Sequence, residues 1–171
     1  MLELKNYDEG MSSYLKRLDA KKMPLLSWNF YGDYLNQLIH HFSDQNLLLH
    51  LGKNKGWEYS SAIRKSWDMD TVVVVTCPSL KIVYATKNMV RMNGYHPEEV
   101  IGQSPKMFQG EATCLKTSQE IRFAVENKQP FEKIVTNYCK DGSLYSCHIK
   151  AFPIFDRKGN FKNFIAFEKA A

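Results

Sequence analysis

The spacing of apolar residues changes character near residue 70. Before it, apolar side chains recur at helical spacing. One narrow stripe consists of Met11, Tyr14, Leu15 and Leu18. A second stripe predicts an amphipathic helix that buries Trp28, Tyr31, Leu35, Leu38, Ile39 and Phe42. The face predicted to be polar carries Asp33, Asn36, Gln37, His40 and His41. Residues 52–56 then predict a turn, and residues 57–67 a further short helix.

After Asp70 the pattern predicts strands and very short helices. The β-branched run 72–75 predicts a buried strand, and residues 81–85 predict its hairpin partner. Residues 88–92 predict one or two helical turns. In residues 93–110 a turn is followed by Pro97 at a first helical position, with Glu98 and Glu99 in the first turn, where the helix dipole favours negative charge. This stretch of tiny helices predicts a wall over a pocket.

The rest of the chain predicts a longer helix and three strands. The helix covers about residues 113–127, and one stripe of it carries Cys114, Ser118, Ile121 and Val125. The strands cover residues 131–138, 144–155 and 160–169, and Asp141-Gly142 is a hairpin signal between the first two. This order of elements predicts an α+β fold, in which helices gather on one face of an antiparallel sheet.

Alternation along the last two strands places apolar side chains on both sheet faces. One face receives Tyr145, Cys147, Ile149, Ala151, Phe164, Ala166 and Glu168. The opposite face receives Phe152, Ile154, Ile165 and Phe167. Because the middle helices can cover only one face, we expect the N-terminal helices to cover the other, or to form a dimer interface with it.

Composition and charge exclude several classes of protein. The chain has 171 residues, 44% of them hydrophobic, and a net charge of +5 from scattered lysines, which is typical of a solvated surface rather than a nucleic-acid site. No segment approaches about 18 consecutive apolar residues, so no membrane span is expected.

The four cysteines share no C-x-x-C spacing, and no export signal is visible, which predicts reduced thiols in a cytoplasmic protein. Metal-ligand spacing, a phosphate loop, a nucleophile elbow and a paired acid and base are all missing from the sequence, so we expect no enzyme.

From residue 70 to 169 the sequence resembles a PAS domain, and within that family the light-oxygen-voltage (LOV) subgroup. The resemblance rests on Asn88, Asn93-Gly94-Tyr95, residues 98–102, Phe108-Gln109-Gly110, Asn137-Tyr138, Lys140-Asp141-Gly142, Pro153, Asp156 and Gly159. It implies a PAS-like five-stranded antiparallel sheet that cups a small cavity, used for sensing and for protein–protein signalling. The predicted domains are therefore an N-terminal helical extension, residues 1–69, and a LOV-like PAS domain, residues 70–171.

The resemblance also implies a set of candidate flavin-binding residues. The subgroup's adduct-forming cysteine is Pro105 here, and the asparagine before it is Ser104, so that photochemistry is not expected. The candidates are Lys106 and Arg122 for a phosphate, Gln109 and Asn137 for polar ring contacts, and Cys147 and Glu168, which replace an asparagine and a glutamine. FMN is one candidate cofactor. Haem is disfavoured because residues 113–127 contain no histidine, and the predicted strand places His148 on the outer face.

Each candidate also has an ordinary structural interpretation. Gln109 and Asn137 either contact a ligand or cap turns, and Lys106 and Arg122 either clamp a phosphate or are simply solvated. Glu168 would be protonated if buried without a partner, but its place near the end of the sequence favours an exposed, frayed position. Cys147 and Cys114 are expected to be small core residues.

These features favour a sensory or regulatory module that binds a small molecule or a protein partner and signals by repacking of helices or of a dimer. We expect a homodimer or a signalling partner. Two alternatives remain open. One is a flavin-binding redox or light sensor without adduct chemistry. The other is a structural dimerisation module whose cavity is filled by Phe164, Tyr145, Met107 and Ile121.

Overall fold

The structure, a computed structural model, describes residues 26–57 and 67–171, with side chains described from Gly32 onward. The helical stripe predicted before residue 22, and most of the short helix predicted over residues 57–67, lie outside these residues. Residues 37–171 form one compact unit, which contains the sheet and the C-terminal part of helix α2 (Leu26–Lys55).

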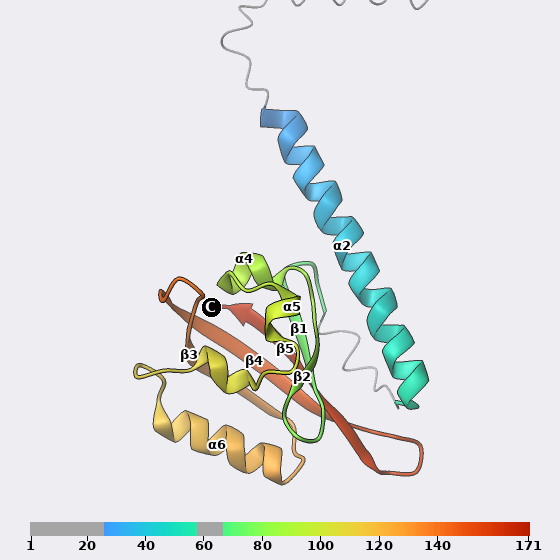
Figure 1. Cartoon of the computed structure of the whole chain (residues 1–171), viewed down its shortest axis with the longest axis vertical. Coiled ribbons are helices and arrows are strands. Elements are labelled where there is room, and N and C mark those ends of the chain that lie inside the picture. The colour runs from blue at the N-terminus through green and yellow to red at the C-terminus, as the bar shows by residue number, and fades with distance from the viewer. Residues whose placement is uncertain (1–25, 58–66) are drawn as a thin grey trace, which may run out of the picture. The chain divides into compact units, whose positions relative to one another are not determined.

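The centre of this unit is a five-stranded antiparallel sheet (Figure 1). Its strands are β1 (Val72–Thr76), β2 (Ile82–Ala85), β3 (Phe131–Tyr138), β4 (Leu144–Phe155) and β5 (Phe161–Ala170), in the spatial order β2-β1-β5-β4-β3. Across one face lie α4 (Met89–Asn93), α5 (Pro97–Val100), the 3-10 helix η1 (Pro105–Phe108) and α6 (Leu115–Glu126). The predicted α+β class and strand positions are confirmed.

The wall of short helices forms for the reasons that the sequence indicates. Pro97 is the first residue of α5, and the backbone N–H of His96 donates to Glu99 Oε2 at 2.9 Å. The other carboxylate oxygen of Glu99 accepts from Lys140 Nζ in the β3–β4 turn. The wall is therefore tied to the far edge of the sheet as well as to its neighbours.

Beneath the wall, one cluster of buried side chains joins the helices to β1 and β2. It consists of Val72, Val74, Ile82, Ala85, Met89, Val100 and Phe108. Asn88 supports the same corner, because its Nδ2 donates to the carbonyl oxygens of Met69 and Thr71 at 3.2 and 2.9 Å. This motif asparagine is structural, and it fixes the start of β1 against α4.

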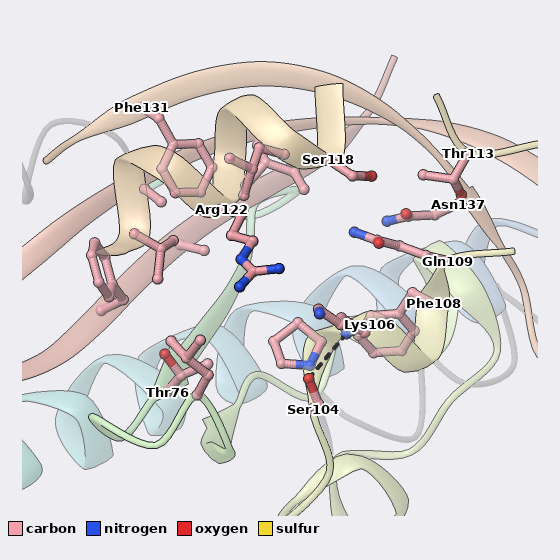
Figure 2. A pocket seen from close by; sticks show the side chains of 18 of the residues that line it. Thr76, Ser104, Lys106, Phe108, Gln109, Thr113, Ser118, Arg122, Phe131 and Asn137 are labelled. Atoms are coloured by element: carbon pink, nitrogen blue, oxygen red, sulfur yellow. Dashed lines mark hydrogen bonds between the residues drawn. The ribbon is translucent and has the colours of Figure 1, made fainter. Parts of the chain in front are cut away.

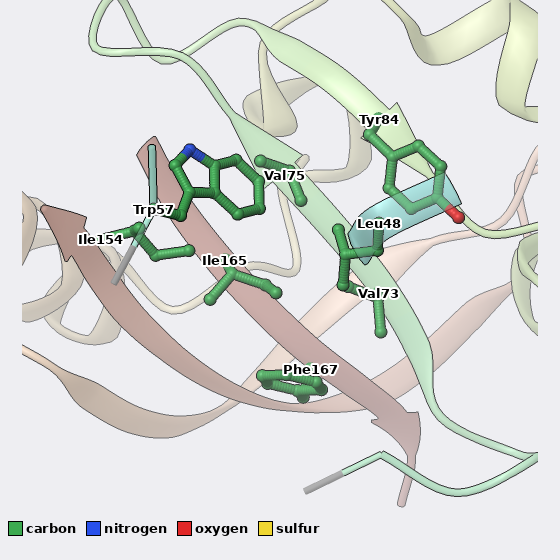
Figure 3. Close-up of a cluster of buried hydrophobic side chains, with 8 residues drawn as sticks. All are labelled: Leu48, Trp57, Val73, Val75, Tyr84, Ile154, Ile165 and Phe167. Carbon is green, nitrogen blue, oxygen red and sulfur yellow. The ribbon is translucent and has the colours of Figure 1, made fainter. Parts of the chain in front are cut away.

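The opposite sheet face carries a second cluster, which includes residues before the strands (Figure 3). Its buried members are Leu48, Trp57, Val73, Val75, Tyr84, Ile154, Ile165 and Phe167. Trp57 Nε1 also donates to Asn163 Oδ1 at 3.0 Å, and Asn163 Nδ2 donates to the Thr76 carbonyl at 2.9 Å. Residues 48–57 thus cover part of the outer face, as predicted for the N-terminal region, while the boundary predicted between residues 69 and 70 stays a prediction.

The face of α2 that meets the sheet differs from the predicted one. The buried positions include Asp44 and Leu48, whereas Leu35, Ile39 and Phe42 are exposed. Asp44 Oδ1 accepts from Tyr84 Oη at 3.1 Å, and Asp44 Oδ2 accepts from the Lys87 N–H at 2.9 Å. The prediction was wrong because these bonds compensate the burial of a charged residue, which apolar spacing alone cannot anticipate.

One further prediction needs correction. The turn expected over residues 52–56 is helical to Lys55, and Gly56, whose φ of 65° is a left-handed conformation that glycine adopts easily, follows the last helical residue. The outer sheet face carries large apolar side chains as predicted, and Glu132 pairs there with His148 at 2.9 Å and with Lys150 at 3.3 Å. Among the described helices, none is long and apolar enough to cross a membrane.

Candidate ligand cavity

A cavity of about 640 Å³ lies between the sheet, η1 and α6 (Figure 2). The sheet contributes Val74, Thr76, Phe131, Asn137, Ile149, Ala151, Phe164, Ala166 and Glu168. The helical side contributes residues from η1 and the following loop, among them Lys106, Phe108 and Gln109, and residues of α6, among them Ile121 and Arg122. The volume falls in the range of about 300–1,000 Å³ that is typical of small-molecule sites.

The loop between η1 and α6 is fastened to the sheet beside the cavity. The Gly110 N–H donates to Thr113 Oγ1 at 3.0 Å, and the Thr113 hydroxyl donates to the Thr136 carbonyl at 2.7 Å. A Cβ at Gly110 would lie 2.6 Å from Cε2 of Tyr138, so only glycine allows this close approach. The fastening holds Gln109 and Asn137, the residue after Thr136, in the lining of the same cavity. Sequence reasoning missed Thr113, which carries no signal beyond its place near a helix start.

Asn137 is the most informative polar residue of the cavity. Its side chain is 3% exposed, and its Oδ1 is buried without a hydrogen-bond partner. A buried acceptor left unpaired costs about 1–3 kcal/mol, so native proteins rarely tolerate one without a reason. Figure 2 shows the Asn137 amide pointing into the cavity. The turn-capping alternative is not what the structure shows, since the side chain lies on β3 inside the cavity.

Glu168 and Cys147 form a buried pair at the sheet. Glu168 lines the cavity and is only 6% exposed, which contradicts the frayed position that we expected; β5 continues to Ala170 and holds it between β1 and β4. The Cys147 thiol donates to Glu168 Oε2 at 3.8 Å. Burial raises the pKa of Glu168 to about 7, and burial together with the nearby carboxyl raises the pKa of Cys147. Cys147 is fully buried and does not itself line the cavity.

Arg122 and Lys106 line the more exposed side of the cavity. In Figure 2 the Arg122 guanidinium extends from α6 towards η1. Its side chain is 72% exposed and forms an ion pair with Glu126 at 2.8 Å, one helical turn away. The Lys106 side chain is exposed, and its backbone N–H donates to Ser104 Oγ at 3.4 Å. Both cations could reach an anionic group at this exposed side of the cavity, but the Arg122 guanidinium would have to bind it while also paired with Glu126.

The structure corrects one other prediction about this region and bears on one alternative. Cys114 is exposed, because it precedes the first residue of α6 instead of lying on its buried stripe. The four residues that would fill the cavity in the alternative of a structural dimerisation module do not fill it. Phe164 and Ile121 line its walls, Met107 packs on the inner cluster, and the Tyr145 hydroxyl accepts from Asn93 Nδ2 at 3.4 Å.

Comparison with known proteins decides the family. The profile of the PAS domain matches residues 70–169, which is more than half of the chain. The chain belongs to the PAS domain family. Relatives of this PAS domain include Protein TWIN LOV 1 of Arabidopsis thaliana, 36% identical over 86 residues, which cover 50% of this chain and 22% of that protein. Phototropin-2 of Oryza sativa subsp. japonica is 33% identical over 93 residues, or 54% and 10% of the two chains.

Solved structures agree with the fold. The dark structure of the blue-light photoreceptor Aureochrome1 LOV gives a TM-score of 0.61 at 24% identity, over 67% of this chain and 86% of that one. A structure from a flavin-analogue study of the LOV domain mechanism gives 0.60 at 25% identity, over 66% and 85%. The PAS domain spans about a fifth or less of the length of the curated relatives named above.

Proposed function

We propose that this chain is a sensory PAS module that binds a small molecule in the cavity beneath η1 and α6. The observation that supports it most directly is the unpaired Asn137 Oδ1, which is buried at a cavity large enough for a ligand. A ligand that donates a hydrogen bond there would remove the cost of the unpaired acceptor. A relative named as a blue-light-activated histidine kinase, from Brucella canis, supports a role in signalling.

FMN is the candidate ligand that the residues fit best. Asn137 and Gln109 offer polar contacts to a ring system, apolar side chains such as Phe164 and Ile121 surround the space, and the cations of Lys106 and Arg122 stand at its exposed side. A bound flavin would supply redox chemistry or the absorption of light. With Pro105 at the position of the subgroup's cysteine, the chain offers no thiol there, and the remaining residues would only bind and orient the ring.

The module's output is proposed to be a protein–protein event rather than a reaction. Solved neighbours include the light-state dimer of the fungal photoreceptor Vivid, and we propose a dimer or a signalling partner for this chain as well. The part of α2 that covers β1 and β5 is the element whose packing a ligand would bias, because β1 contacts the cavity with one face and α2 with the other. No enzymatic activity is proposed, and the cytoplasmic location predicted from the sequence stays a prediction.

An absorbance spectrum of freshly purified full-length protein, before and after blue light, tests this proposal. Flavin bands at about one equivalent per chain would support FMN, and we expect no thiol adduct to form at position 105. Apoprotein titrated with FMN should bind it at least tenfold more weakly after Asn137→Leu, a loss of about 1.4 kcal/mol. Asn54→Leu, at an exposed position of α2, is the control and should bind as wild type does.

Two results would count against the cavity as a ligand site. One is a protein that purifies without any small molecule detectable by native mass spectrometry and does not respond to added flavin in its melting temperature. The other is equal binding by wild type and Asn137→Leu, which would mean that the unpaired amide has no part in recognition.

A further inference from the structure

The outer side of α2 carries a stripe of exposed side chains that the described residues leave uncovered. Ile39 and Phe42 are 62% and 59% exposed, Asn46 is exposed, and Leu49 is 42% exposed. Their spacing alternates between three and four residues, which is the repeat of a coiled-coil seam. The same spacing leads back to the exposed Leu35, four residues before Ile39.

This seam (Leu35, Ile39, Phe42, Asn46 and Leu49) is separate from the face of α2 that holds the sheet. Asp44 and Leu48, which contact Tyr84 and the outer cluster, are buried and fall between the seam positions in the helical repeat. Both faces can therefore be used at once, one within the chain and one outside it. An exposed row of large apolar residues is costly to leave in water, which favours a partner for it.

The composition of the seam points to a second copy of the same chain. Asn46 falls at an a position, with Ile39 one heptad before it, while Phe42 and Leu49 fall at d positions. A single asparagine at an a position is the feature that fixes register and two-stranded pairing, because its amide is satisfied by the same amide of an in-register parallel neighbour. The stripe is thus self-complementary, as a two-fold dimer requires.

We propose that two copies of this chain pair in parallel through the seam of α2, with Asn46 facing Asn46 across the two-fold axis. This deepens the dimer part of the proposed function. The seam spans residues 35–49, about two heptads of this 30-residue helix, and the a positions before and after it are Gly32 and Lys53. One helix then joins its own sheet through Asp44 and Leu48 and its partner through Phe42 and Leu49.

Sedimentation equilibrium of the full-length chain tests the seam. We expect a dimer. Phe42→Glu should raise the dissociation constant of this dimer at least tenfold, because the substitution buries like charges opposite each other. Leu47→Glu is a matched control, because Leu47 is 49% exposed on the same helix but lies at a b position outside the seam. A dimer that both substitutions weaken equally, or that neither weakens, would overturn the seam.

Disulfide trapping gives a second, geometric readout that does not depend on dimer strength. In a Cys114→Ser background, which removes the exposed native thiol, Leu49→Cys should cross-link on mild oxidation and Leu47→Cys should not. Cross-linking at position 47 but not at 49 would overturn the proposal. Retained cross-linking in a protein that binds no ligand would refute the cavity and keep the seam, and flavin binding without cross-linking at 49 would do the reverse.

Discussion

Glu168 makes the stability of this domain depend on pH in a direction opposite to that of most carboxylates. It is buried, its hydrogen-bond donor within the described part of the chain is the Cys147 thiol, and its pKa rises from the usual 4.5 to about 7. The folded protein therefore keeps a proton on Glu168 that the unfolded chain has already released. Between pH 4.5 and 7 the unfolded state binds fewer protons, so the free energy of unfolding falls as pH rises.

The size of the effect follows from the pKa of Glu168 in the folded protein and in the unfolded chain. A tenfold difference between the two acid dissociation constants corresponds to about 1.4 kcal/mol. The stabilisation is complete below the unfolded pKa, is lost by the folded pKa, and amounts to about 3 kcal/mol. Because Glu168 is only 6% exposed, solvent screening reduces this figure little. Glu168→Gln keeps the shape and the acceptor for the Cys147 thiol while removing the titration.

Urea unfolding of wild type and Glu168→Gln, measured between about pH 5 and pH 8, isolates this contribution. The two proteins should be similarly stable at the acidic end, and the variant should be more stable by about 2–3 kcal/mol at the basic end. The difference between them cancels the acidic groups whose pKa is lowered, such as Asp68 and Asp156, which act below this window. Parallel curves for the two proteins would refute a buried, proton-binding Glu168.

Two further predictions concern the cap and the loop. Deleting residues 1–69 removes Asp44, Leu48 and Trp57 from the outer face and should leave a fragment that aggregates, whereas deleting residues 1–36 should leave a folded protein. Light scattering distinguishes the two fragments, and a well-behaved monomer from residues 70–171 would contradict the covering role. Gly110→Ala should cost about 1–3 kcal/mol in urea unfolding, because its Cβ would displace the Tyr138 ring, whose hydroxyl accepts from the Ala112 N–H. Gly32→Ala is the control, because its Cβ would meet open space inside α2, and it should leave stability unchanged or raise it by up to about 1 kcal/mol. An unchanged midpoint for Gly110→Ala would refute the close approach.

The fold could be predicted from local signals because the sequence and the tertiary structure agree in the PAS region. The valine run of β1 is buried on both faces, and the Asp141-Gly142 turn joins β3 to β4 as expected. Alternation along β5 correctly assigned Phe164, Ala166 and Glu168 to the cavity and Ile165 and Phe167 to the outer cluster. The site predicted by resemblance was largely brought together, with Cys147 displaced behind Glu168.

The predictions that failed depend on partners distant in sequence. The buried face of α2 is chosen by the bonds of Asp44 to Tyr84 and Lys87, about 40 residues away, while apolar residues lie on both sides of the helix. Glu168 looked frayed because it is near the end of the sequence, yet pairing with β1 and β4 buries it. The bonds of Asp44 leave no trace in local spacing, and alternation gives the face on which Glu168 lies but not whether the end of its strand is paired.

The alternation along β1 bears on how such a domain can diversify. Val74 and Thr76 contact the cavity, while Val73 and Val75 contact Leu48 and the rest of the outer cluster. Consecutive residues of one strand are therefore under different selection. Those on the cavity side are selected for the chemistry of the ligand, and those on the outer side for packing against the docked helix. Mutations on one side can accumulate with little penalty on the other, so a lineage could exchange its chemical input while inheriting the same mechanical output.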